Sequence, residues 1–218
     1  KSFSAPEFSD LNNDGNPDLI LGNIDDAADF FWNNSHSFPA TFSKDTSVLY
    51  HIYNSGQTNT NSDYPTFIDL DGDLDLDLVI GGYNGLRYYE NIGTLSSPEF
   101  TAVDTIFIDV NSQIGSDAQP AFIDIDDDGD LDLYAGIGES LLGGPTPGIT
   151  IGFRNTGTAN APVFTLDNTL VTGIPDIGLN SYPTFVDLDN DEDYDLVFGR
   201  DLQTLVYYRN TGSKQSPV

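Results

Sequence analysis

Four short runs of alternating acidic or amide residues constrain this chain more than any other feature. In each run, a carboxylate or amide side chain stands at every second position of a nine-residue stretch, and a leucine follows. So many carboxylates in one loop repel one another unless a cation lies among them. Ca²⁺ suits such a loop because it takes about six to eight oxygen ligands and tolerates irregular geometry. The runs are Asp10–Asp18, Asp69–Asp77, Asp124–Asp132 and Asp187–Asp195.

The odd positions of each run supply the candidate ligands. Positions 1, 3 and 5 offer side-chain oxygens, position 7 offers its backbone carbonyl, and the aspartate at position 9 suits bidentate contact. We expect about four Ca²⁺ ions per chain, with the weakest site in the first run, which has three carboxylates against five or six in the others. The candidate metal-binding residues are Asp10, Asn12, Asp14, Asn16, Asp18, Asp69, Asp71, Asp73, Asp75, Asp77, Asp124, Asp126, Asp128, Asp130, Asp132, Asp187, Asp189, Asp191, Asp193 and Asp195.

Two other interpretations of the acidic runs were considered. An EF-hand loop begins with the same spacing but needs a glutamate at position 12 and a helix behind it. Position 12 is hydrophobic in all four runs, which excludes the EF-hand. A solvated or disordered acidic stretch would not keep one register through four copies. Each run also has an aliphatic residue at position 2 and leucine at position 10, which we expect to anchor the loop to a core.

The segments around each run predict strands. Short apolar stretches rich in β-forming residues lie on both sides, so each run is expected to join the two strands of a hairpin. An aromatic third segment follows and ends in asparagine, and in the middle units a fourth follows a proline (98–101 and 162–165). The runs recur every 55 to 63 residues, and small sheets bury their faces by stacking radially. The sequence predicts an all-β fold, a β-propeller or partial propeller of four four-stranded antiparallel blades with calcium-loaded hairpin loops.

The repeated motif also resembles a known family. The pattern Phe-x-Asp-x-Asp-x-Asp-Gly-Asp-x-Asp-Leu, a strand ending in glycine and a closing Asn-Thr-Gly resemble the FG-GAP and VCBS repeats of integrin α-subunit propellers and many secreted bacterial proteins. The resemblance covers nearly the whole chain and implies Ca²⁺ in the hairpin loops of propeller blades. Leu74 and Glu192 depart from it by replacing the loop glycine, and Asn12 and Asn16 lower the charge of the first loop.

The chain is expected to form a single repeat domain over residues 1–218. The units are approximately 1–58, 59–113, 114–176 and 177–218, and the last one lacks its outer strand. The missing strand would leave the edge of the aromatic segment 205–208 unpaired, so either the protein continues beyond this sequence or a neighbouring chain supplies the strand by self-assembly through this C-terminal edge. Insertions at residues 55–63 and 139–148 are candidate places for ligand binding.

Composition narrows the class of protein. A net charge of −28 argues against nucleic-acid binding, and twenty of the 35 acidic residues lie inside the four runs. No apolar stretch is long enough to span a membrane. The absence of cysteine excludes disulfides, thiol catalysis and zinc–thiolate sites. These features favour an extracellular, secreted or cell-surface protein.

Catalysis is not expected. His36 and His51 stand in no recognisable catalytic motif, and most clustered carboxylates are assigned to the loops. The aromatic pairs Tyr88-Tyr89 and Tyr207-Tyr208 are interpreted as core between blades rather than as sugar-stacking surfaces. The favoured function is a calcium-binding module for extracellular interaction or adhesion with a protein or glycan ligand. The alternatives are a structural subunit of an extracellular fibre or surface assembly formed by strand pairing and, ranked last, a glycan-binding or glycan-processing domain.

Overall fold

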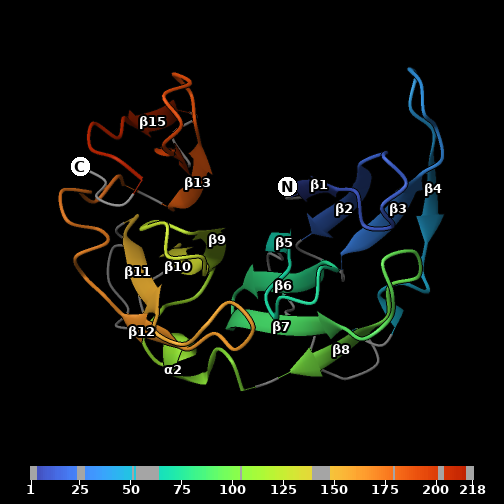
Figure 1. Ribbon diagram of the computed structural model, residues 1–218, viewed down its shortest axis with the longest axis horizontal. Coiled ribbons are helices and arrows are strands. Elements are labelled where there is room, and N and C mark those ends of the chain that lie inside the picture. Colours follow the sequence, from blue (N-terminus) through green and yellow to red (C-terminus); the bar gives the residue numbers. More distant parts are fainter. Residues whose placement is uncertain are drawn as a thin grey trace.

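The computed structural model shows four small antiparallel sheets that follow one another around a ring, as the blades of a four-bladed β-propeller do (Figure 1). It describes residues 4–23, 28–50, 52, 64–103, 105–138, 148–178, 180–200 and 204–214. The predicted all-β propeller architecture is confirmed. The candidate binding insertion at 55–63 lies outside the described residues, as does the one at 139–148 except for Gly148.

Each sheet is built from one continuous stretch of chain, and its strands pair in sequence order. Three sheets have four strands, and the fourth has three within the described residues. The strands are β1 (Ser4–Ser9), β2 (Asp18–Asn23), β3 (Asp29–Asn33) and β4 (Phe42–Asp45); β5 (Tyr64–Ile68), β6 (Asp77–Gly82), β7 (Gly85–Asn91) and β8 (Phe100–Val103); β9 (Gln119–Ile123), β10 (Asp132–Gly136), β11 (Thr150–Asn155) and β12 (Phe164–Leu166); and β13 (Tyr182–Val186), β14 (Asp195–Arg200) and β15 (Thr204–Tyr208).

The acidic runs join the first and second strands of each sheet, as predicted. In every sheet, the last aspartate of the run is the first residue of the second strand and pairs with the last residue of the first strand. The alternation of ligand residues therefore belongs to the hairpin connection and ends where the strand begins.

The fourth strands begin two residues later than the sequence predicts, at Phe100 and Phe164. The cause is the asparagine that ends the third strand. The side-chain oxygen of Asn91 accepts the N–H groups of Gly93 and Glu99 at 3.1 and 2.9 Å, which holds the segment between them in a turn. In the third sheet, Asn155 accepts two corresponding N–H groups at 2.9 Å.

Hydrophobic residues from neighbouring sheets form the cores between blades. One cluster joins the first and second sheets, a second joins the second and third, and a third joins the third and fourth. Tyr88 and Tyr89 point to opposite faces of the second sheet and are buried in different clusters, which confirms the prediction for this pair. The short helix α2 (Ile108–Asn111) contributes Val110 to the core between the second and third sheets.

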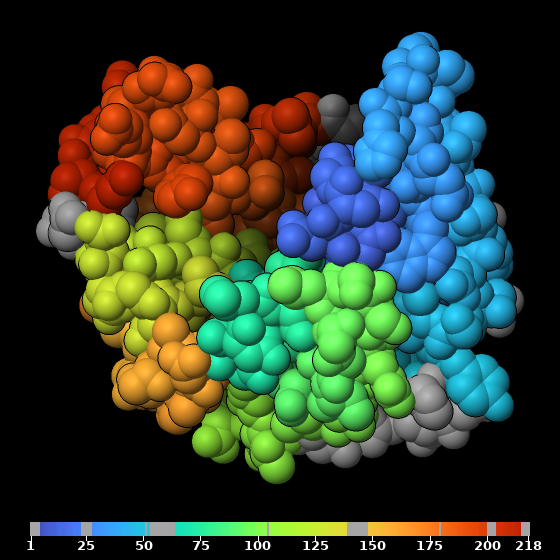
Figure 2. Space-filling model, turned by 45° about the vertical axis from the view of Figure 1, so that its right-hand side comes forward, coloured from blue at the N-terminus to red at the C-terminus, as the bar shows by residue number. Residues whose placement is uncertain are grey.

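The ring is open between the first and fourth sheets. The ribbon shows β13 and β15 apart from β1 and β2, and the space-filling view shows a notch between these two parts (Figures 1 and 2). In the described part of the chain, no hydrophobic cluster combines residues of both sheets. The predicted burial of Leu188 and Tyr207 is therefore wrong, since both face this opening and are exposed.

No helix within the described residues is long and apolar enough to cross a membrane.

Glycine at the fifth position of the second strand allows the next blade to approach. A Cβ atom at Gly81 would lie 2.1 Å from the carbonyl oxygen of Ala118, and one at Gly136 would lie 2.0 Å from that of Ser181. Both oxygens belong to backbone at the start of the following blade. At Gly199 the nearest atom is the Cβ of Tyr182 at 3.4 Å, and no other sheet of the described chain packs against this position.

We predict that Gly136→Ala destabilises the protein by about 1–3 kcal/mol, because a rigid backbone carbonyl would have to move. This corresponds to a fall of roughly 2–4 °C in the melting midpoint per kcal/mol for a chain of this size. Gly199→Ala is the matched control and is expected to leave the midpoint nearly unchanged. Thermal unfolding followed by circular dichroism compares the two, and equal losses would contradict the described packing.

Candidate metal centres

The first aspartate of each acidic run organises the loop. Asp10 accepts the backbone N–H groups of Asp14 and Gly15 at 2.9 and 2.8 Å. Asp124 does the same for Asp128 and Gly129, at 3.0 Å each. The equivalent residues Asp69 and Asp187 also accept N–H groups from their own turns. The loop backbone is thus folded around the position 1 carboxylate in all four repeats.

Positive φ angles at positions 4 and 6 let each loop turn this tightly. Gly129 has φ +93° and Gly15 has φ +87°, values that glycine adopts without steric cost. At the same position, Leu74 has φ +77° and Glu192 has φ +71°. The two departures from the loop glycine therefore keep the loop conformation but place a residue with a Cβ in the left-handed region, which costs about 1–2 kcal/mol.

The last aspartate of each run is buried and connects the loop to the third strand. The backbone N–H of Asn91 donates to Asp77 at 2.8 Å. Equivalent bonds join Asn33 to Asp18, Asn155 to Asp132 and Asn210 to Asp195. Sequence reasoning assigned position 9 to metal binding alone and missed this structural bond. The repeated asparagine at the end of the third strand was the signal that accompanies it.

Three of the four loops bring carboxylates together in groups that could hold a metal ion. The groups are Asp69, Asp71 and Asp77; Asp124, Asp126 and Asp128; and Asp187, Asp189 and Asp191. One oxygen from each member lies within 4.8 Å of the other two. Within the described residues, the remaining predicted ligands of these loops stand outside these groups: Asp73, Asp75, Asp130, Asp132, Asp193 and Asp195.

Position 7 provides an independent sign that these loops could bind a cation. The Oδ1 atoms of Asp75, Asp130 and Asp193 are each buried and have no hydrogen-bond partner. They stand at the same position in the three loops that carry an aspartate group. A buried carboxylate oxygen without a donor is costly. A hard cation bound among these oxygens would satisfy all three sites, so the residues present fit such an ion.

The electrostatics of these loops agree with this fit. Burial and then repulsion from Asp73 raise the pKa of Asp75. Burial and then repulsion from Asp128 raise the pKa of Asp130 in the same way. Without a cation, burial and mutual repulsion therefore disfavour the ionised form of these carboxylates.

The first loop differs because amide side chains of the loop itself donate hydrogen bonds to one of its carboxylates. The side-chain amides of Asn12 and Asn16 donate to Asp14 at 3.2 and 2.7 Å. The backbone N–H of Asn16 is the main cause of a lowered pKa at Asp14, with these amide bonds adding to it. The structure holds Asp10, Asn12, Asp14, Asn16 and Asp18 in one loop, but this loop is not among the three carboxylate groups.

Arg154 of β11 and Arg209, which directly follows β15, reach the third and fourth loops. Arg154 forms ion pairs with Asp126 and with Asp167 and lies 3.8 Å from Asp132. Arg209 pairs with Asp189 at 2.5 Å and with Asp191 at 3.4 Å. The equivalent residue of the second sheet is Glu90, because each of the three precedes the asparagine that ends the third strand. The second loop thus has no such cation from its own third strand.

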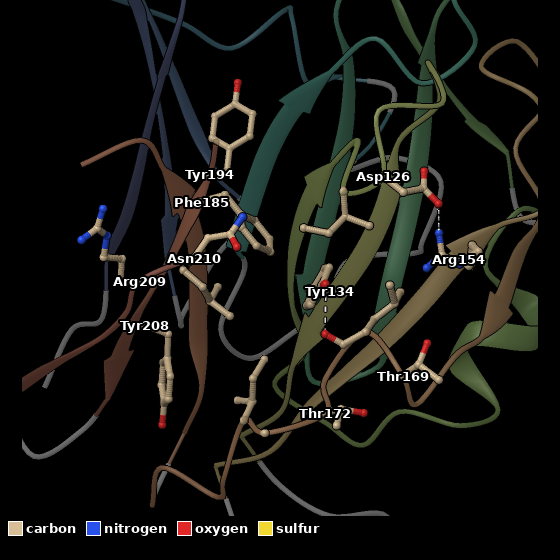
Figure 3. Close-up of a pocket in the computed structure, with 15 residues that line it drawn as sticks. Asp126, Tyr134, Arg154, Thr169, Thr172, Phe185, Tyr194, Tyr208, Arg209 and Asn210 are labelled. Atoms are coloured by element: carbon tan, nitrogen blue, oxygen red, sulfur yellow. Dashed lines mark hydrogen bonds and ion pairs between the residues drawn. The ribbon is translucent and has the colours of Figure 1, made fainter. Parts of the chain in front are cut away.

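A cleft of about 440 Å³ lies between the third and fourth sheets. Figure 3 shows the residues that line it, with the Tyr134 hydroxyl donating to the carbonyl oxygen of Leu170 at 3.1 Å. The ring of Phe185 packs edge-on against Tyr134. Tyr194 is exposed, and Arg154 and Arg209 line the cleft and pair with carboxylates of the third and fourth acidic loops. No sequence pattern predicts this cleft, since its residues come from two repeats.

A family model for FG-GAP-like repeats matches residues 10–80 and again residues 69–135. Comparisons with curated proteins and with solved structures found no match.

We predict that acidification stabilises the metal-free protein. Burial raises the pKa of Asp77 to about 6 and, likewise, that of Asp132 to about 6. The unfolded value is about 3.9, so between about pH 4 and 6 the folded chain binds more protons and its stability falls as the pH rises. In chelator, the melting midpoint should therefore rise by several degrees from pH 7 to about pH 5. In Ca²⁺ it should fall, because protons displace the ion.

Asp132→Asn provides the control for this pH dependence. The asparagine keeps the oxygen that accepts the Asn155 N–H, while its amide replaces the oxygen that has no hydrogen-bond partner. The variant should show a flatter rise in chelator than the native chain. An unchanged slope would show that Asp132 does not titrate in this range.

We also predict that Arg154→Gln lowers the melting midpoint more in chelator than in Ca²⁺. In chelator, the guanidinium is the cation that offsets the third loop, whereas bound Ca²⁺ would take over that role. The expected loss is about 1 kcal/mol, typical of a partly exposed ion pair. Lys44→Gln, which removes an exposed ion pair with Asp29 outside the loops, is the control and should give the same small shift in both conditions. A larger loss in Ca²⁺ for Arg154→Gln would contradict the interpretation.

Proposed function

Because the chain belongs to the FG-GAP-like repeat family, we propose that it is a secreted calcium-binding β-propeller module for interaction or adhesion at the cell exterior. The ion has a structural role in this proposal. The single observation that carries it is the coincidence, in three loops, of an aspartate group and a buried position 7 oxygen without a partner.

Ca²⁺ fits these loops better than other common ions. The donors are carboxylate oxygens, and neither histidine nor cysteine is present in any of the runs. Oxygen ligands favour Ca²⁺, Mg²⁺ and Mn²⁺ over the softer metals. The number of carboxylates in each loop suits an ion that accepts about six to eight oxygens, whereas Mg²⁺ usually keeps several waters and takes only one or two carboxylates. Bound Ca²⁺ would neutralise the carboxylates and link positions of the loop that otherwise repel one another.

All four loops are proposed to bind Ca²⁺, with the first the weakest. Its carboxylate Asp14 already accepts amide and backbone hydrogen bonds, so an ion gains less there. Affinity in oxygen-ligand sites also follows the number of charged ligands.

The cleft between the third and fourth sheets is the proposed place for a protein or glycan ligand. It combines an exposed aromatic side chain, Tyr194, with the Arg209 guanidinium. Tyr194 belongs to the fourth loop and Arg209 pairs with it, so calcium bound there would stabilise the ligand-binding surface. The proposed role is binding without catalysis, since the clustered carboxylates are engaged in the loops.

A structural subunit of an extracellular assembly is the second candidate. The observation that favours it is that β15 has no strand on its outer side among the described residues. Pairing of that edge with a strand of another chain would give this sheet the four strands that the other sheets have.

Two variants within one loop test the metal proposal. Asp128→Asn removes a carboxylate of the aspartate group, whereas Asp127→Asn removes the exposed neighbour, whose φ of +59° asparagine also adopts. Extracellular calcium sites bind with dissociation constants of roughly 10⁻⁴–10⁻³ M, so each site adds about 0.4–1.4 kcal/mol near 1 mM Ca²⁺. We predict that Asp128→Asn lowers the melting midpoint in Ca²⁺ but much less in chelator, and that Asp127→Asn changes both little.

Calorimetric titration completes the test. Four sites should be found in the native chain, and Asp128→Asn should weaken one of them by about tenfold or more. Two or fewer sites, or equal effects of the two variants on calcium binding, would overturn the proposal.

A further inference from the structure

One face of the fourth sheet is uncovered although its residues match a buried face elsewhere in the chain. We call the face of a sheet that points toward the next repeat its leading face. On the fourth sheet it consists of Thr184, Val186, Leu188, Val197, Leu205 and Tyr207. Leu205 is 77% exposed, whereas Leu86, at the same register position of the second sheet, is 1% exposed. Tyr207 donates to Asp195 at 2.9 Å, just as buried Tyr88 donates to Asp77 at 2.8 Å.

The first sheet has the complementary uncovered face. We call the face that points toward the preceding repeat the trailing face, and on the first sheet it carries Phe8, Leu19, Phe31 and Phe42. Phe8 is 57% exposed, whereas its counterpart Phe67 is 8% exposed. The rings of Phe8 and Phe42 lie 6.4 Å apart and form an aromatic pair open to solvent.

Gly199 is a second, independent sign that another sheet can pack on this face. Gly81 and Gly136 occupy the same strand position, and at both the backbone of the next blade lies where a Cβ would be. Gly199 has the same clearance on the leading face of the fourth sheet, with only Tyr182 of its own sheet nearby. The surface therefore matches the internal interfaces in backbone shape as well as in side-chain character.

We propose that a second copy of this chain docks on these faces, its first sheet packing on the fourth sheet of its partner. The molecule already builds this kind of interface three times, between leading and trailing faces of successive sheets. The uncovered leading and trailing faces are the two halves of one more interface of the same kind. Their separation across the opening leaves each free for another molecule (Figure 2).

The contact is heterologous, because the two surfaces that meet are different. Two copies that each use both faces would close into a ring, and a rotation that does not close would give a filament. The contact uses sheet faces and is therefore distinct from pairing along the edge of β15. With a net charge of −28 per chain, two copies repel each other, so association should be measured in Ca²⁺ and at about 0.15 M salt.

Sedimentation analysis of charge variants tests the proposal. Leu205→Asp and Phe8→Asp each disrupt one half of the contact, and each alone should weaken self-association by about tenfold or more. A mixture of the two variants should form a heterodimer, because each retains the half that the other has lost. Ile108→Asp, at an exposed hydrophobic residue of α2 away from both faces, is the control and should associate like the native chain.

Gly199→Val tests the contact without adding charge. Its Cβ meets only ordinary contacts in one chain, so the melting midpoint of the dilute protein should change little while self-association is lost. Unchanged association in this variant would contradict close backbone approach at Gly199.

Because the chain has no cysteine, introduced thiols identify the contact directly. Leu205→Cys mixed with Phe8→Cys should give a dimer with a short bifunctional maleimide, and neither variant alone should do so efficiently. A native chain that stays monomeric in Ca²⁺ at high concentration would overturn the proposal. So would a double-cysteine variant that links only within one chain, which would indicate closure of its own ring, or a mixture of the two charge variants that does not associate.

Discussion

The repeat depends on the buried aspartate that begins each second strand. Its carboxylate accepts the N–H of the asparagine at or just after the end of the third strand, so the hairpin loop is fixed to that strand. In the two middle sheets, that asparagine uses its side chain to hold the start of the fourth strand. In these sheets, one carboxylate and one amide side chain therefore connect the acidic loop, the end of the third strand and the start of the fourth strand. In the first, second and fourth repeats, a second backbone N–H donates to the same carboxylate, which offsets part of the cost of burying it.

The same arrangement places the mutually repelling carboxylates of the loop next to this buried aspartate. In the second loop, Asp77 accepts the Asn91 N–H and also belongs to the aspartate group, so the structural bond and the candidate metal site share one side chain. Loops three and four receive an arginine, and the first receives asparagine amides. Among the described residues of the second repeat, no arginine forms an ion pair with the second loop. The four loops thus have one backbone design and different ways of offsetting their charge.

The sequence predicted most of what lies within one repeat. The alternation of acidic residues placed the hairpin loops, and the flanking apolar segments placed the first three strands of each sheet. Within a repeat, residues are close in sequence, so local spacing determines which atoms meet. The same spacing did not reveal that Asp75, Asp130 and Asp193 would each bury an oxygen without a partner, because that depends on the depth of the loop in the folded chain.

Properties that depend on a neighbouring sheet were not predictable from the repeat alone. Leu70 and Leu188 occupy the same loop position, yet only Leu70 is buried, because only the second sheet has another sheet on that side. Tyr88 and Tyr207 differ for the same reason. In repeat architectures, stability is approximately the sum of the repeats and of the interfaces between them, and a terminal repeat needs a polar outer face to remain soluble alone. The outer faces here keep the apolar residues and the glycine of an internal interface, so their exposure reflects their place in the array and not a change in sequence character.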